Sequence, residues 1–170
     1  DADDLLASGG ARLYKAMAQL KADGLVEKIG VSVYERSQID ALIERYPLDL
    51  VQLPVNVLDQ RLIRGGQIEL LKACGTEVHA RSVFLQGLLL MDPEATPTYF
   101  APVRPLLHKW HNAAAEAGLV PLEAALDPRP EGERVGNAGN GVVAGVVDVL
   151  DVGGEREPRR HLRSIMELLS

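Results

Sequence analysis

Residues 78–90, VHARSVFLQGLLL, decide how the rest of the chain is interpreted. The stretch begins as a short run of alternating apolar and polar residues, typical of a buried β-strand, and the strand is expected to end at Ser82. It then breaks into a loop at Gln86 and Gly87. In α/β proteins, a strand that ends in polar residues and passes into a glycine-containing loop is a common way to build a ligand site. The stretch therefore predicts a strand followed by a binding loop.

Helical and strand patterns alternate upstream of this stretch. Apolar spacing and turn residues predict helices at 11–22, 37–46 and 67–73, and strands at 28–33, 50–55 and 77–82. Such alternation with short connections is typical of a parallel α/β sheet whose strands are joined by helices.

Local signals set the expected ends of these elements. Ser37 and Asp40 fit a capping box at the start of the second helix, and Pro47 ends it. Pro54 is expected near the end of its strand, where no N–H donor is required.

The last quarter of the chain has a different character. A helix is predicted at 102–117 and the start of another at 122–126, but the prolines that follow Asp127 forbid its continuation. Further along, we expect a strand at 142–152 and a helix at 159–169.

We therefore expect one α/β domain over residues 1–126 and a divergent C-terminal segment over 127–170, which would supply the last strand and helix of the same domain. A slip of the reading frame near Asp127 would account for the change, and translation of the other two frames tests it.

The composition is that of a soluble globular protein, with 46% hydrophobic and 25% charged residues among 170. The net charge of −6 argues against a nucleic-acid or anionic-membrane partner. No apolar run approaches the roughly 20 residues of a membrane-spanning helix, and the acidic first residues do not resemble a signal peptide. The single cysteine, Cys74, excludes an internal disulfide and suits a reducing compartment, so a cytoplasmic location is expected.

Three segments together resemble the aldo-keto reductases. KIGVSV at 28–33, DLVQLPVN at 49–56 and VHARSVFLQGLL at 78–89 are similar to the family's fifth, sixth and seventh strands, in the same order and spacing. The resemblance covers about residues 1–126. It implies an α/β fold that is a partial (β/α)8 TIM-type barrel, roughly strands five to eight with their helices.

The resemblance also implies a nicotinamide-cofactor site. Ser32 and Gln52 would hold the nicotinamide carboxamide, because a fixed glutamine amide is complementary to a primary amide. Val33 stands where the family usually has an asparagine. Arg81 stands where the family stacks an aromatic residue on the nicotinamide ring. A planar guanidinium can also stack on a ring, but it disfavours the cationic oxidised cofactor.

The loop after the third strand matches the family's pyrophosphate-binding loop, in which backbone N–H groups and a hydroxyl meet phosphate oxygens. The matching residues are Ser82, Phe84, Gln86 and Gly87. The implied cofactor is NADP, with NAD as the alternative, and the implied substrate is a small carbonyl compound.

The family's catalytic aspartate, tyrosine, lysine and histidine belong to its first four strands, and none of those strands is recognised in this chain. We therefore expect an NAD(P)(H)-dependent oxidoreductase of the aldo-keto reductase type present as a fragment, without catalytic residues and inactive alone. The alternatives are a non-catalytic dinucleotide-binding or interaction module and a truncated, inactive gene product. The module would form a homodimer or pair with a complementing chain through its open sheet edges.

The remaining chemistry-bearing residues are given structural interpretations. His79 shares a strand face with Arg81 and is interpreted as a hydrogen-bonded core histidine. Cys74 is interpreted as a small buried residue. His108 and His111 are expected on a solvated helix face, because the sequence shows no carboxylate pattern for a metal site beside them.

Overall fold

The computed structural model describes residues 1–126. The strand and helix predicted near the C-terminus lie outside the described residues. Two compact units are present, and each is described by itself. The first unit comprises Asp1–Val55 and Gln60–Arg81, and the second comprises Asn56–Asp59 and residues 82–126.

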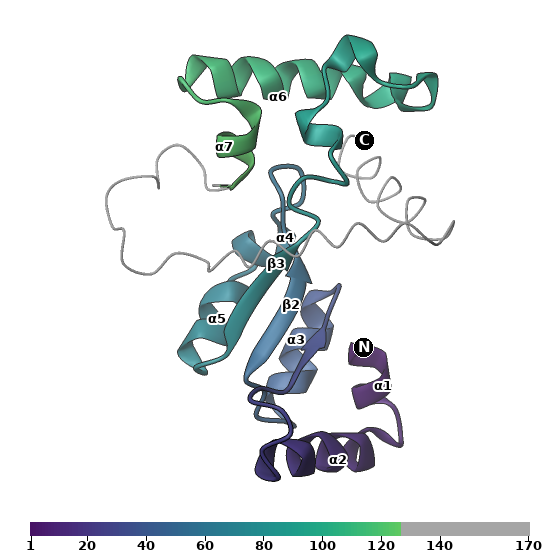
Figure 1. The fold of residues 1–170 in the computed structure, drawn as a ribbon, viewed down its shortest axis with the longest axis vertical. Helices are drawn as coiled ribbons and strands as arrows, with labels where there is room; N and C mark the ends of the chain where they lie inside the picture. The colour runs from purple at the N-terminus through teal and green to yellow at the C-terminus, as the bar shows by residue number, and fades with distance from the viewer. Residues whose placement is uncertain (127–170) are drawn as a thin grey trace. The chain divides into compact units, whose positions relative to one another are not determined.

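A parallel sheet of three strands forms the centre of the first unit, within the residues described (Figure 1). The strands are β1 (Gly30–Ser32), β2 (Leu50–Pro54) and β3 (Glu77–Arg81), with β2 in the middle. The three predicted strands are thus confirmed, each somewhat shorter than expected. Pro54 is the last residue of β2, as expected of a residue that has no N–H donor.

Helices precede and connect these strands. They are α1 (Ala2–Leu6), α2 (Gly10–Ala22), α3 (Arg36–Ile43), α4 (Arg61–Arg64) and α5 (Gln67–Ala73). The predictions of α2, α3 and α5 are confirmed, and α5 agrees to the residue. Helices α1 and α4 were not predicted, because one turn or so of helix is too short to show an apolar period.

The start of α3 differs from its prediction. The N-cap is Glu35, and the capping box joins Glu35 to Gln38. The amide oxygen of Gln38 accepts the N–H groups of Tyr34 at 2.8 Å and Glu35 at 3.0 Å. The box predicted from Ser37 and Asp40 is therefore wrong, because Ser37 already lies inside the first helical turn.

The two faces of the sheet are covered differently. Successive side chains of a strand point to opposite faces. On one face, Val31, Val51 and Val78 lie in register and are buried, as are Leu53 and Ala80. Right-handed crossovers place α3 and α5 on the same face, and these two helices contact each other. Helices α3 and α5 cover this apolar face. We call the opposite face of the sheet the open face.

The second unit is mainly helical. It contains η1 (Leu88–Leu90), η2 (Pro93–Ala95), η3 (Thr98–Val103), α6 (Arg104–Glu116) and α7 (Pro121–Leu126). Its core consists of Leu88, Leu89, Val103, Leu107 and Ala125. The helices predicted at 102–117 and 122–126 correspond to α6 and α7.

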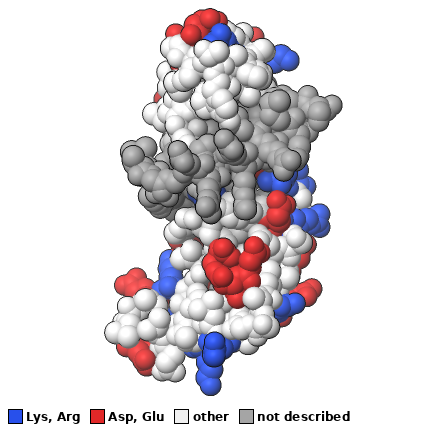
Figure 2. Space-filling view, turned by 90° about the vertical axis from the view of Figure 1, so that its right-hand side faces the viewer, with Lys and Arg blue, Asp and Glu red and all other residues white. Residues whose placement is uncertain are grey.

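The described surface carries charges of both signs. Figure 2 shows basic and acidic side chains interspersed on the face that it draws. No helix among residues 1–126 is long and apolar enough to cross a membrane.

Candidate functional site

A row of polar side chains crosses the open face of the sheet. Ser32, Gln52 and His79 pair in register across the three strands, and all three are half-buried. Adjacent strands lie about 4.8 Å apart, so neighbouring side chains of this row are close to each other. We call these three residues the Ser32 row. It brings together Ser32 and Gln52, the two residues that the family resemblance assigns to the nicotinamide carboxamide.

The members of the Ser32 row differ in their hydrogen bonds. The Nε2 atom of His79 lies 2.6 Å from Oε1 of Glu77, as expected for a hydrogen-bonded histidine, although the side chain remains 25% exposed rather than fully in the core. In the part of the chain that the structure describes, no hydrogen bond engages the Ser32 hydroxyl or the Gln52 side-chain amide. One hydroxyl and one amide are therefore available on an open sheet face.

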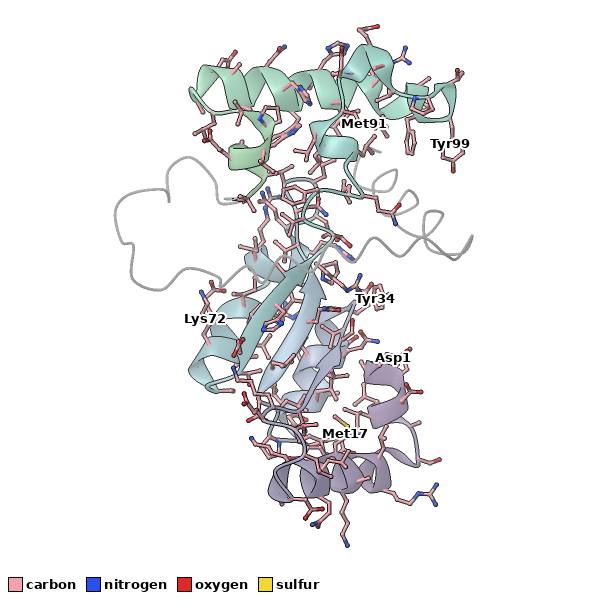
Figure 3. The ribbon with its side chains drawn as sticks, in the orientation of Figure 1. Asp1, Met17, Tyr34, Lys72, Met91 and Tyr99 are labelled. Atoms are coloured by element: carbon pink, nitrogen blue, oxygen red, sulfur yellow. The ribbon has the colours of Figure 1, made fainter. Side chains whose placement is uncertain are left out.

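Arg81 lies on the same face, two residues beyond His79 along β3. Its guanidinium carbon is 4.0 Å from the centroid of the Tyr34 ring, and Nη2 donates to the carbonyl oxygen of Val33 at 3.3 Å. The Nε atom of Arg81 is buried and has no hydrogen-bond partner among the described residues. Figure 3 shows Tyr34 at the C-terminal end of β1. Arg81 and Tyr34 thus form a cation–π pair at the carboxyl edge of the open face.

Sequence reasoning missed Tyr34. The family resemblance directs attention to an aromatic residue after β3, and that position is Arg81. In the structure, an aromatic ring reaches this edge from the end of β1 instead. Strand parity could have indicated it, because Tyr34 follows Ser32 by two residues and shares its face.

The four predicted loop residues Ser82, Phe84, Gln86 and Gly87 belong to the second unit. The φ angles are 58° at Ser82, 49° at Leu85, 55° at Gln86 and 89° at Gly87. Left-handed backbone is unfavourable for residues other than glycine. Leu85 and Gln86 adopt it in succession and Ser82 adopts it three residues earlier, which makes this a strained loop, and strained backbone is frequent at ligand-binding sites.

An ionic network occupies the opposite, N-terminal edge of the sheet. The Glu77 carboxylate accepts hydrogen bonds from Lys28 and His79, and Asp49 accepts one from Lys21. The hydrogen bond from Lys28 is the main cause that lowers the pKa of Glu77, and that from Lys21 lowers the pKa of Asp49. Glu77 in turn raises the pKa of Lys28. The network links the three strands to one another and to the preceding α2. Its role is therefore structural.

Two other predictions concern residues away from the sheet's open face. Cys74 is exposed at the C-cap of α5, so its interpretation as a buried residue is wrong. His108 is exposed, as expected for a solvated face, and its Nε2 atom lies 2.9 Å from Oε1 of Glu94. His111 is instead half-buried, and its Nε2 atom lies 3.1 Å from the Leu89 carbonyl oxygen. Among residues 1–126, no group of three or more His, Cys, Asp or Glu side chains is arranged to hold a metal ion.

Comparison with known proteins places this fold. The sequence profile of the Aldo/keto reductase family matches residues 11–127. Among solved structures, the chain resembles a glycerol dehydrogenase of Gluconobacter oxydans, with a TM-score of 0.52 and 20% identity. The likeness covers 66% of this chain and 39% of that chain, and at this identity it concerns the fold alone. No curated protein sequence matches the chain.

Proposed function

The chain belongs to the aldo/keto reductase family, and on this premise we propose that it binds a nicotinamide cofactor at the open face of its sheet. The cofactor would serve an oxidoreductase that interconverts carbonyl and alcohol groups. The single observation that carries the proposal is the register of Ser32 with Gln52, which sets a hydroxyl beside an amide on a sheet face that the described helices leave open.

The residues of the Ser32 row fit a carboxamide. A primary amide offers two donors and an acceptor, and the Gln52 side chain offers the complementary set, to which Ser32 adds a hydroxyl. Val33 is fully buried and apolar, so it offers no side-chain hydrogen bond. Ser32 and Gln52 alone would therefore orient the carboxamide. When bound, the cofactor supplies or accepts the hydride.

Arg81 supports the same proposal. A buried N–H group without a hydrogen-bond partner is uncommon in native proteins, and an oxygen of a bound ligand would satisfy Nε of Arg81. From the family resemblance alone, we propose that Ser82, Phe84, Gln86 and Gly87 of the strained loop bind the pyrophosphate of the cofactor. We propose NADP as the cofactor and NAD as the alternative.

We further propose that β1, β2 and β3 are strands five to seven of a (β/α)8 barrel. The family's catalytic tyrosine, lysine, aspartate and histidine belong to the first four strands, and no residue of this chain is assigned to those roles. The chain alone is therefore expected to bind cofactor without reducing a carbonyl.

A second candidate function is a non-catalytic dinucleotide-binding module that pairs with another chain. Its support is that β1 and β3 each have a single neighbouring strand within residues 1–126. Unpaired strand edges favour association with another sheet.

The proposal is tested by fluorescence titration of the purified chain with NADPH. We expect saturable binding, and Gln52→Leu should weaken it about tenfold because two or more hydrogen bonds are lost. The matched control is Gln19→Leu, which removes an exposed glutamine of α2 that bonds Asp23; its affinity should equal that of the wild type. Absence of saturable binding, or a Gln52→Leu variant as tight as the wild type, would overturn the proposal.

A further inference from the structure

We propose that Tyr34 is a positioning residue, which holds Arg81 so that the site prefers the reduced, neutral nicotinamide ring over the oxidised, cationic one. The inference rests on the proposed function. It adds to that function a residue that determines which redox form of the cofactor binds.

The guanidinium of Arg81 is held from one side. An arginine side chain is long and flexible, and in water it samples many rotamers. Here the guanidinium carbon lies over the Tyr34 ring, 4.0 Å from the ring centroid, and the Val33 carbonyl oxygen accepts a hydrogen bond from Nη2 at 3.3 Å. These two contacts hold the guanidinium at the carboxyl edge of the open face.

Tyr34 is itself fixed by contacts that do not involve Arg81. Its backbone N–H donates to the Gln38 side-chain oxygen at 2.8 Å, and the Gln38 amide nitrogen donates to Asp3 at 2.7 Å. Residues of α3 and α1 therefore hold the strand end that carries the ring. Because its support is independent of Arg81, Tyr34 can act as the fixed partner and Arg81 as the positioned one.

The cation–π pair of Arg81 and Tyr34 lies beside the Ser32 row. Arg81 and Tyr34 each follow a member of that row by two residues, which is about 7 Å along a strand. Between them, Pro54 pairs in register with Arg81. The Arg81 side chain therefore crosses β2 above the buried Pro54 to reach Tyr34. A ring held by its carboxamide at the Ser32 row would have this pair as its neighbour at the carboxyl edge of the sheet.

The charge of Arg81 decides between the two redox forms. A guanidinium stays protonated at all physiological pH values, and it can stack on a neutral ring. Against a pyridinium ring, the same contact opposes two positive charges, and the repulsion is stronger at a half-buried sheet face than in water. If Tyr34 did not hold it, the guanidinium would turn into solvent, and the discrimination would be reduced.

The test measures the dissociation constants for NADPH and NADP⁺ separately, the first by fluorescence and the second by competition. The measured quantity is the ratio of the two constants. For the wild type we expect NADPH to bind at least about tenfold more tightly. Tyr34→Leu and Arg81→Gln should both reduce this ratio at least about threefold, whereas Tyr34→Phe, which keeps the ring, should preserve it.

The control is Tyr14→Leu, which removes another stacked ring of the first unit, 4.7 Å from Tyr46; the ratio should be unchanged. A wild-type chain that binds neither form would overturn the proposed function and this inference with it. If both forms bind and Tyr34→Leu weakens them equally, the proposed function stands and the inference is wrong. Should Tyr34→Leu fail to fold, as judged by circular dichroism, an Arg81→Gln variant with the wild-type ratio would overturn the inference.

Discussion

Gly30 lies two residues before Ser32 on β1, and its lack of a side chain determines how closely β2 packs there. A Cβ atom at this position would lie 2.3 Å from the Leu50 carbonyl oxygen and 2.5 Å from Leu50 Cγ. The Leu50 side chain of β2 therefore lies over Gly30 of β1, and only a residue without a side chain allows this close approach.

We predict that Gly30→Ala destabilises the chain. Because backbone atoms of Leu50 must shift, the free energy of unfolding should fall by about 1–3 kcal/mol, measured by urea denaturation. The control is Gly9→Ala, where φ is −88° and nothing lies within 4 Å of the added Cβ. Equal stability of Gly30→Ala and the wild type would contradict the close packing of Leu50 on Gly30.

The residues of the site were predictable from sequence to different degrees. Ser32, Gln52 and Arg81 could be placed on one face, because each lies at the end of a recognisable strand and parity then fixes its side. The cation–π contact of Arg81 with Tyr34 could not be predicted, because it depends on the rotamer of a long side chain. The exposure of Cys74 was also missed, since an apolar helix end does not tell which of its last residues faces the core.

At the scale of elements, the strands and the longer helices followed from apolar periodicity, while their ends depended on single side chains. Gln38 of α3 shows why: its amide oxygen reaches back to two N–H groups before the helix and moves the N-cap to Glu35. In sequence, Ser37 with Asp40 fits a capping pattern as well as Glu35 with Gln38 does. Only the folded backbone decides between them.

The ionic network at the N-terminal edge of the sheet predicts a pH dependence. The folded-state pKa values of Glu77 and Asp49 are lowered from their ordinary 4.5 and 3.8. The stability that these carboxylates contribute is therefore present above those values, and it is lost as the pH falls through the lower folded-state values. Lys28 has the opposite sign: its pKa is raised from 10.5, so its contribution is lost only as the pH rises above that value.

We predict that Glu77→Gln flattens the acid limb of the stability curve. The urea midpoint of the wild type should fall as the pH decreases from about 5 to about 3, and the variant should show a smaller fall because it lacks one titrating carboxylate. Glu69→Gln, at an exposed position of α5, serves as the control with the wild-type slope. Identical slopes in Glu77→Gln and the wild type would exclude Glu77 as a contributor.

The strained loop after β3 predicts a conflict between stability and binding. Gln86 has φ 55° and is exposed, so Gln86→Gly should raise the free energy of unfolding by about 0.5–1 kcal/mol. The same change should weaken NADPH binding, because a freer loop must be ordered by the ligand. Thermal melts and titrations measure the two effects. Gln19→Gly, inside α2, is the control and should be destabilised. A Gln86→Gly variant that is less stable than the wild type would contradict the strain.

At the scale of the whole molecule, the described sheet has an open face and two strands with one neighbour each. We predict that the purified chain associates through these edges, so that light scattering after size exclusion gives twice its 18.4 kDa mass at micromolar concentration. A monomer that unfolds cooperatively at every concentration would contradict this.

The central claim is that the Ser32 row holds the nicotinamide carboxamide, and NMR of the Gln52 side-chain amide tests it most directly. The two amide proton signals are assigned by their absence in Gln52→Leu, and the ligand is reduced nicotinamide mononucleotide, which lacks the adenosine half of the cofactor. We predict saturable shifts of both Gln52 signals and of the Ser32 backbone amide, with the signals of Gln19 unchanged. If the ligand binds and the Gln52 signals do not move, or if it does not bind at all, the claim is wrong.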